Sequence, residues 1–261
     1  MPFFNEDQIA SVLEWTPLID TMERALISLS AGEVEQPVRQ MVPVRDRDGI
    51  IAAMPAVGEA MAVKVVTLFH ENAGTNLLTH QAVIIVFDVT NGTPLAVMDG
   101  RLITEMRTAA GSAAAVRPMA ELRLWSRTEE NGRAAAEKIS ATFFNDPESA
   151  VCGADIVATT TSAKLPILMG DWLKSGAFAT SVGWNGADGR ELDDSAMNNT
   201  VIDEDTATAR NQAGNIRGSG CAIFSEVGEN YAGAKSVPVG TTVIYDSVGV
   251  AILDESAAKQ A

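Results

Sequence analysis

The spacing of apolar residues changes along the chain, and the change falls just after residue 115. Up to residue 32 the apolar positions follow the period of a helix, and from residue 34 to residue 99 they mostly alternate as in strands. After residue 115, short apolar runs alternate with segments of helical length. The pattern therefore predicts an α/β protein in which a largely antiparallel sheet is followed by a parallel one.

Two helices and five strands are expected in the first half. Asn5-x-x-Gln8 has the form of a capping box, and Thr16-Pro17 places a capping threonine before a proline at the first helical position. Asn91-Gly92 predicts a tight turn between the last two strands. The strands are expected at residues 38–44, 50–54, 62–69, 82–90 and 94–98.

One of these strands carries a cation among valines. Lys64 interrupts an otherwise apolar run. A lysine in that position is either an edge-strand residue that discourages aggregation or a residue of a functional site. The strand pattern leaves both interpretations open.

Residues 100–115 predict a helix of very small side chains. Thr104 is the expected N-cap, which places Arg107 in the first turn, where free N–H groups and the helix dipole favour anions. A guanidinium there suggests a fork for carboxylate or phosphate. We expect its partner to be a ligand carboxylate or a cofactor phosphate, with Glu105 and Asp99 as competing partners. The alternative is a tightly packed helix with a surface arginine.

The second half predicts alternating strands and helices. A short strand at 122–126 runs into Ser126-Arg127-Thr128, and a polar helix follows at 129–139. A strand within 155–161 ends in three threonines. Further elements are expected as strands at 177–182, 201–202 and 241–245, a helical turn at 171–175, a helix from about 203 and a last short helix.

Composition narrows the functional classes. The net charge of −15 argues against nucleic acid or an anionic membrane as the main partner, so an anionic ligand would need a few cations gathered in one place. We expect no metal site, because His70 and His80 share no ligand spacing with a cysteine. Cys152 and Cys221 form no Cys-x-x-Cys pair. With no signal peptide or membrane-spanning segment expected, the predicted location is cytoplasmic.

Several short segments, in a fixed order, resemble the ornithine cyclodeaminase/mu-crystallin family, and most closely its ketimine-reductase branch. The resemblance covers nearly the whole chain. The matching segments are Gln36-Pro-Val-Arg39, Lys64-Val-Val-Thr-Leu-Phe, His80-Gln81, Asn91 to Gly100, Arg107-Thr-Ala-Ala, Trp125-Ser-Arg-Thr128, Gly153-Ala-Asp-Ile-Val, Pro166-Ile-Leu, Arg190-Glu-Leu-Asp-Asp194 and Asp246-Ser-Val-Gly249.

The resemblance implies a fold and a function. The fold is a sheet-rich domain for dimerisation and substrate, residues 1–113 with 246–261, and a Rossmann-like NAD(P)-binding domain, residues 114–245. The implied activity is NAD(P)H-dependent reduction of cyclic ketimines to cyclic amino acids by a homodimer. Alternatives within the family are cyclising deamination of ornithine to proline and non-catalytic binding of a small molecule resembling thyroid hormone.

The resemblance also implies roles for individual residues. Arg39, Lys64 and Arg107 match the residues that hold the substrate carboxylate, and Val248 and Gly249 match the segment that returns to the active site. Lys64 and Asp188 match the catalytic positions, with Asp188 acting near the substrate nitrogen; the residues alone favour an ordinary turn aspartate there. The positions implied to contact the cofactor are Thr79, His80, Arg107, Ser126, Arg127, Thr128, Thr160 and Thr161.

The end of the 122–126 strand bears on the choice of cofactor. NAD enzymes usually place an acid there to bind the ribose 2′-hydroxyl. Ser126, Arg127 and Thr128 suit a 2′-phosphate instead, so NADP is expected rather than NAD. The alternative is a polar strand end in which Thr128 only caps the following helix.

The chain departs from the family at one point. Only a few residues separate the small-residue helix from the 122–126 strand, and no Gly-x-Gly-x-x-Gly occurs there. We therefore expect a Rossmann-like domain that lacks its first β-loop-α unit. That loop supplies the N–H groups that hold a pyrophosphate, so cofactor affinity is expected to be low.

Overall fold

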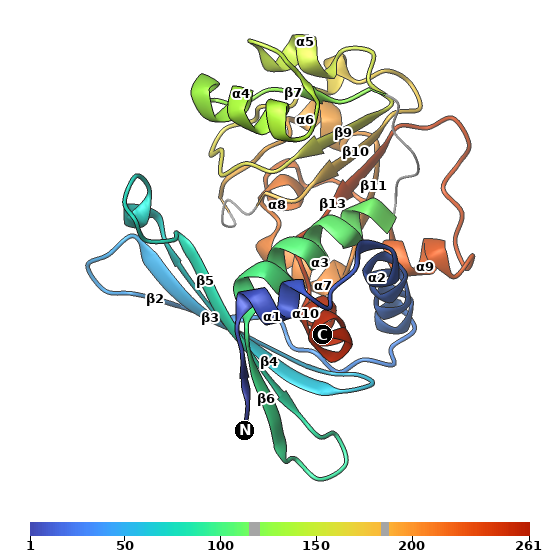
Figure 1. Ribbon diagram of the computed structural model, residues 1–261. Coiled ribbons are helices and arrows are strands. Elements are labelled where there is room, and N and C mark those ends of the chain that lie inside the picture. The colour runs from blue at the N-terminus through green and yellow to red at the C-terminus, as the bar shows by residue number, and fades with distance from the viewer. Residues whose placement is uncertain (115–120, 184–187) are drawn as a thin grey trace. The chain divides into compact units, whose positions relative to one another are not determined.

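The computed structural model describes residues 1–114, 121–183 and 188–261 (Figure 1). The chain divides into two compact units. Unit 1 contains Met1–Ala115 and Gly249–Ala261, and unit 2 contains Val116–Val248. The return to the first unit comes at Gly249 rather than at the expected residue 246, because Asp246 is still the last residue of a strand of unit 2.

Unit 1 is built on a six-stranded sheet in the order β1-β6-β5-β4-β3-β2. Strands β2 to β6 pair antiparallel, as the alternating pattern predicted, whereas β1 pairs parallel to β6 and was not expected. Because Lys64 lies in the interior strand β4, its interpretation as an edge-strand residue is wrong. The strands are β1 Phe3–Phe4, β2 Gln40–Pro43, β3 Gly49–Val57, β4 Met61–Phe69, β5 His80–Phe87 and β6 Pro94–Asp99.

Helices cover one face of this sheet. In Figure 1 helices α3 and α10 lie beside the sheet with α2 next to them. Alternate strand residues such as Met54, Ile84 and Met98 point inward and are buried, because side chains of a strand alternate between the two faces. The helical elements are α1 Glu6–Ala10, α2 Trp15–Ser30, the 3-10 turn η1 His70–Asn72, α3 Gly100–Ala114 and α10 Ala251–Gln260.

The helix starts differ from two expectations. The capping box of Asn5 and Gln8 is present, but α2 begins at Trp15, before Thr16, and Glu14 occupies its N-cap position. Helix α3 begins at Gly100, directly after β6. Thr104 is therefore not an N-cap; its hydroxyl donates to the carbonyl of Gly100, 2.7 Å away, from inside the helix.

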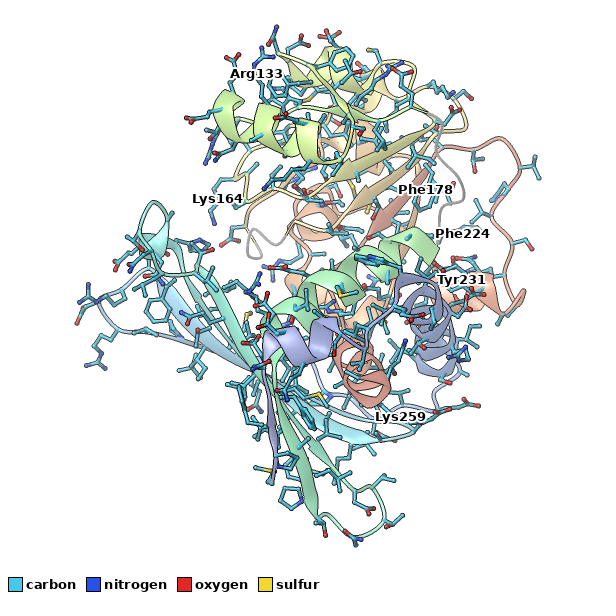
Figure 2. The ribbon with its side chains drawn as sticks, in the orientation of Figure 1. Arg133, Lys164, Phe178, Phe224, Tyr231 and Lys259 are labelled. Atoms are coloured by element: carbon cyan, nitrogen blue, oxygen red, sulfur yellow. The ribbon has the colours of Figure 1, made fainter. Side chains whose placement is uncertain are left out.

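Unit 2 holds a parallel five-stranded sheet, in the order β12-β11-β13-β10-β9, and a separate pair formed by β7 and β8. Helix α4 packs on this pair and carries Arg133, which Figure 2 labels. The guanidinium of Arg133 lies 4.7 Å from the ring centre of Phe143. The elements are β7 Arg123–Leu124, α4 Glu129–Lys138, β8 Thr142–Phe143, α5 Pro147–Val151, β9 Ile156–Thr159, the 3-10 turn η2 Gly170–Trp172, β10 Phe178–Ser181, α6 Asp194–Met197, β11 Thr200–Asp203, α7 Thr206–Gln212, α8 Gly214–Ser219, β12 Ile223–Glu226, α9 Val227–Tyr231 and β13 Val243–Asp246.

The two sheets of unit 2 show where the fold departs from a complete Rossmann domain. Among the described residues, β7 pairs only with β8, and β9 pairs only with β10. In the complete fold the first strand lies between the second and fourth strands in the order 3-2-1-4. Since β7, β8 and β9 correspond to the second, third and fourth strands, the observed break matches the predicted loss of the first β-loop-α unit.

Candidate functional site

A buried lysine forms the centre of a charged cluster in unit 1. Lys64 points to the helix-covered face of β4 and is 2% exposed. Its Nζ lies 2.6 Å from Oδ2 of Asp254, which sits on α10 and is itself buried. A buried charge needs a partner of opposite sign, and Asp254 is that partner for Lys64.

Arg107 reaches the same carboxylate from α3. Its Nε lies 2.9 Å from Oδ1 of Asp254, and the arginine is 5% exposed. The expected competitors are excluded, because Glu105 pairs with Arg101 and the carboxylate of Asp99 accepts the amide of Arg101. The carboxylate that pairs with Arg107 is therefore that of Asp254, which was not among the expected partners.

The position of Arg107 in its helix also differs from the prediction. Since α3 begins at Gly100, Arg107 lies about two turns inside it and not in the first turn. The dipole of this helix end therefore gives no reason for an anion beside Arg107, because that effect is confined to the first turn.

Arg39 joins the cluster from the segment before β2. Its guanidinium donates to the carbonyl of Gly249, at the start of the returning segment. Gln36, three residues earlier, accepts the amide of Ile252 at 3.0 Å in the first turn of α10. The segment Gln36-Pro-Val-Arg39 therefore holds the returning chain in place while it contributes a cation.

The electrostatics of the cluster favour an additional anion. Burial, followed by repulsion from Arg107 and Arg39, lowers the pKa of Lys64 to about 7 despite the attraction of Asp254. Burial and the charges of Lys64 and Arg107 lower the pKa of His80 to about 4. Lys64 therefore faces two guanidinium groups and one carboxylate, and a ligand carboxylate would relieve the repulsion.

A second buried network lies in unit 2, at the carboxyl ends of β9 and β10. Glu191 is fully buried and accepts the hydroxyl protons of Thr159 at 2.8 Å, Thr161 at 2.7 Å and Ser181 at 2.8 Å, together with two backbone amides. In open α/β sheets, ligands bind outside the carboxyl ends of parallel strands. Glu191 therefore holds in place the ends of β9 and β10, at the edge of the sheet where a nucleotide is expected to bind.

The residues at the end of β7 fit a phosphate. Arg127 is exposed, and Thr128 occupies the N-cap position of α4 without making a capping hydrogen bond, so the interpretation of Thr128 as only a cap is not supported. A 2′-phosphate could be held by these groups and by Ser126. The sequence lacks the glycine-rich loop that binds a pyrophosphate. The residues present therefore fit the adenosine phosphate of a dinucleotide better than its central pyrophosphate.

The other predicted residues lie on both units. Thr160 is exposed beyond β9, while the hydroxyl of Thr161 is engaged by Glu191. Thr79 is exposed just before β5 in unit 1. Asp188 is exposed in a turn of unit 2, beside residues 184–187, which lie outside the described part of the chain.

Val248 and Gly249, expected together at the site, fall on opposite sides of the unit boundary. Val248 belongs to unit 2, where its amide donates to Glu204 at 3.0 Å, and Gly249 belongs to unit 1. The structure thus brings together Arg39, Lys64, Arg107 and Gly249 within unit 1. It leaves the roles of the other predicted residues as predictions.

Two functional candidates were missed from the sequence, Asp254 and Glu191. A signal for Asp254 was present, since it follows the apolar run Val250-Ala-Ile-Leu253 in a helix that is buried on most sides. Three cations assigned to one site also require a counter-charge. Glu191 stood in the segment Arg190-Glu-Leu-Asp-Asp194 that resembles the family, but no pattern within that segment indicates that the acid is buried.

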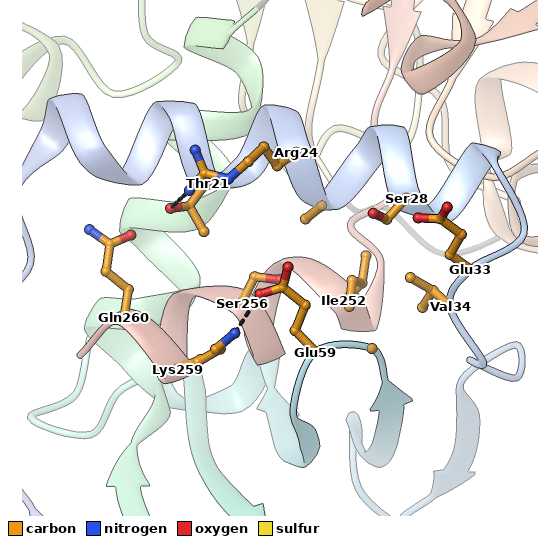
Figure 3. Close-up of a pocket in the computed structure, with 12 residues that line it drawn as sticks. Thr21, Arg24, Ser28, Glu33, Val34, Glu59, Ile252, Ser256, Lys259 and Gln260 are labelled. Carbon is orange, nitrogen blue, oxygen red and sulfur yellow. Dashed lines mark hydrogen bonds and ion pairs between the residues drawn. The ribbon is translucent and has the colours of Figure 1, made fainter. Parts of the chain in front are cut away.

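A separate hollow of about 460 Å³ lies on unit 1 (Figure 3). Helix α10 contributes Ile252, Ser256 and Lys259 to its wall, and Lys259 pairs with Glu59 at its rim. Ile252 and Asp254 lie about 200° apart around a helix. The hollow therefore opens on the other side of α10 and is not part of the charged cluster.

Comparison with known proteins agrees with this geometry. The model of the ornithine cyclodeaminase/mu-crystallin family matches residues 4–121 and 113–261. Ketimine reductase mu-crystallin of Mus musculus is 37% identical, covering 93% of this chain and 90% of the mouse protein. That alignment spans 285 positions, more than the 261 residues of this chain, so the mouse protein contains internal residues that are absent here. Delta(1)-pyrroline-2-carboxylate reductase of Bacillus cereus is 27% identical, covering 95% of this chain and 92% of that protein.

Solved structures support the fold. The Delta(1)-pyrroline-2-carboxylate reductase of Thermococcus litoralis, in complex with NADH and L-proline, superposes with a TM-score of 0.93 at 27% identity, over 100% of this chain and 96% of that one. An archaeal alanine dehydrogenase dimer with bound NAD gives a TM-score of 0.90 at 21% identity, over 99% and 93% of the two chains. By sequence and by fold, this chain is a member of the ornithine cyclodeaminase/mu-crystallin family.

Proposed function

We propose that this protein reduces cyclic imino acids to cyclic amino acids with a reduced nicotinamide dinucleotide. The observation that carries the proposal is the cluster of Arg39, Lys64 and Arg107 around a single buried carboxylate. An excess of cations in a buried site favours a ligand that brings its own carboxylate. The related reductases from mouse and Bacillus cereus support the same reaction class.

In this proposal the residues of unit 1 bind and orient the substrate. Arg39, Lys64 and Arg107 hold the carboxylate, which fixes the position of the adjacent imine carbon. Lys64 is also a candidate proton donor, because a pKa near 7 allows it to give up a proton at neutral pH. Asp188 is proposed to act near the imine nitrogen. A bound nicotinamide would supply the hydride.

We further propose that NADPH is used in preference to NADH. The support is the exposed guanidinium of Arg127 beside Ser126 and Thr128, at the end of β7. No acid occupies the strand end where NAD enzymes usually bind the ribose 2′-hydroxyl. Binding is expected to be weaker than in a complete Rossmann domain, because the pyrophosphate loop is missing.

The test is a substrate panel assayed by the absorbance of reduced nicotinamide. For ornithine, release of ammonia is measured instead, because its conversion to proline and ammonia causes no net change in the nicotinamide. The panel contains Delta(1)-pyrroline-2-carboxylate, a six-membered cyclic ketimine, ornithine with NAD, and pyruvate with ammonia. Reduction of the cyclic imino acids, abolished by Lys64→Met, is the expected result. Lys259→Met is the matched control, since Lys259 lies on the surface of unit 1 and pairs only with Glu59 among the described residues. Turnover of ornithine without imine reduction would overturn the proposal.

A second candidate is a protein that binds a carboxylate ligand without catalysis. It is favoured by one observation, the missing glycine loop beside an intact cluster in unit 1. Calorimetric titration with NADPH separates the two candidates. Micromolar binding supports the reductase, and no binding up to millimolar concentration together with binding of L-proline supports the second candidate.

We also propose a homodimer formed through the open face of the six-stranded sheet. Several strand residues that point away from the helices are apolar and substantially exposed, with Ile51 at 42%, Val83 at 38% and Leu95 at 48%. A sheet with apolar residues on both faces is normally covered on both. Light scattering at tens of micromolar is expected to give the mass of two chains, and a monomer alone would contradict this.

A further inference from the structure

The carboxylate of Asp254 lies between two cations that come from different elements. Oδ2 is 2.6 Å from Nζ of Lys64 on β4, and Oδ1 is 2.9 Å from Nε of Arg107 on α3. All three residues are at most 5% exposed. One aspartate therefore links α10, α3 and the sheet, and each of its two oxygens is assigned to a different cation.

This arrangement sets the distance between the two cations. Without Asp254 the ammonium and the guanidinium would be buried side by side with only repulsion between them. Three charged groups act on Lys64 from the elements packed around it: Asp254 on α10, Arg107 on α3 and Arg39 before β2. His80 on β5 is the neighbouring titratable group, and its own pKa is lowered by burial and by the charge of Lys64. Asp254 is the one anion in this set, which is drawn from the described residues.

We propose that Asp254 is a positioning residue of the substrate site, which fixes Lys64 and Arg107 in place and keeps Lys64 protonated to receive a carboxylate. This inference rests on the proposed function, because it takes the ligand to be the carboxylate of an imino or amino acid. Asp254 does not touch that ligand; it acts through the two cations. The carboxylate of the ligand then supplies a second negative charge to the three cations, of which Asp254 neutralises only one.

The first test needs no ligand. Lysine side chains are labelled with ¹³C at Cε, and the signal of Lys64 is assigned with Lys64→Met. In the natural protein its titration midpoint is expected near pH 7, as the surroundings of Lys64 dictate. Asp254→Asn removes the attraction and should lower the midpoint by about one unit or more, which reduces the protonated fraction at pH 7 from about one half to about one tenth.

A matched control is available next to Asp254. Glu255 is also buried on α10, but its carboxylate accepts the amide of Ala60 and the hydroxyl of Ser256 rather than a cation of the cluster. Glu255→Gln makes the same change of charge on the same helix. It should leave the midpoint of Lys64 where it is. A midpoint that does not move in Asp254→Asn, or that moves equally in both variants, overturns the proposal.

The second test uses L-proline as the probe, measured by calorimetry between pH 5.5 and pH 8.5. For the natural protein, affinity should fall as pH rises above about 7, because Lys64 loses its proton. For Asp254→Asn the same fall should occur at lower pH, so that binding is about tenfold weaker at pH 7.5 and recovers near pH 5.5. A loss that is equal at every pH would show a merely structural role and would overturn the proposal.

If Asp254→Asn does not yield folded protein, Asp254→Glu carries the test. This variant keeps the charge, so the titration midpoint of Lys64 should stay near pH 7. The extra methylene should displace the two cations and weaken the binding of L-proline. Unchanged affinity would count against positioning. Failure of the proposed function is distinguishable: the natural protein would then bind no imino or amino acid, although Asp254 still controls the titration of Lys64.

Discussion

Gly249 lies directly against the guanidinium of Arg107. A β-carbon built on Gly249 would come 2.6 Å from Nη1, and the residue has a φ of +68°. Its carbonyl also accepts the guanidinium of Arg39. The returning chain therefore contacts two of the three cations, Arg39 and Arg107, through Gly249. A side chain at this position would collide with Arg107 and would not suit the backbone conformation.

Gly249→Ala is expected to lower both stability and affinity for L-proline. A left-handed conformation costs a non-glycine residue about 1–2 kcal/mol. The added carbon must also displace Arg107 from Asp254. Gly240→Ala is the control, because Gly240 has a φ of +80° but nothing within 4 Å of its added carbon. Chemical unfolding and calorimetry should show the larger loss for Gly249→Ala, and equal losses would contradict the contact with Arg107.

Arg107→Met should destabilise the ligand-free protein. The carboxylate of Asp254 loses a buried charge-assisted hydrogen bond, which is worth about 1.5–3 kcal/mol. Arg101→Met, on the same helix, removes pairs with Glu6 and Glu105 that are partly exposed and should cost less than about 1 kcal/mol. Urea unfolding compares the two variants. A ligand-free protein that keeps its stability without Arg107 would show that Asp254 does not depend on this arginine.

Asp203→Asn should stabilise the protein, and the gain should grow with pH. Burial, followed by repulsion from Glu226, raises the pKa of Asp203 to about 8. Between about pH 4 and pH 8 the folded state therefore keeps a proton that the unfolded state has lost, so stability falls as pH rises. Asparagine removes this dependence. Denaturant unfolding at pH 5 and pH 8 measures the difference, with Asp20→Asn on the exposed face of α2 as the control.

Glu191→Gln should destabilise unit 2 by about 3 kcal/mol or more, because an amide nitrogen would face donors that the carboxylate now accepts. Several hydroxyl and amide donors would lose their acceptor at once. Glu148→Gln, on the surface helix α5, is the control and should have little effect. Thermal unfolding provides the measurement. Similar midpoints for the two variants would mean that the network around Glu191 rearranges at low cost.

Arg127→Ala should weaken the binding of NADPH by about tenfold and leave the binding of NADH nearly unchanged. Only NADPH carries the 2′-phosphate with which a guanidinium pairs. Arg133→Ala is the control, because Arg133 lies on the neighbouring helix α4 and stacks on Phe143. Quenching of intrinsic tryptophan fluorescence can follow both titrations. Equal losses for the two cofactors would remove the support for NADP.

Much of the local structure was determined by the sequence alone. Alternating apolar residues specified the strands of unit 1, and the capping box of Asn5 and Gln8 specified the start of α1, because both depend on neighbours within a few residues. The short interval after the small-residue helix revealed the missing β-loop-α unit, since chain length limits what a segment can build. The cations Arg39, Lys64 and Arg107 could be named because they stood in recognisable segments.

The tertiary structure decided what those cations contact. The partner of Lys64 and Arg107 is Asp254, which lies 190 and 147 residues away in the sequence, and no local pattern connects positions so far apart. The start of α3 at Gly100 was likewise decided by where β6 ends. The last residue of β6, Asp99, accepts a hydrogen bond from the amide of Arg101 in the first turn of the helix. Sequence periodicity identifies which face of an element is buried; only packing determines which buried charges meet.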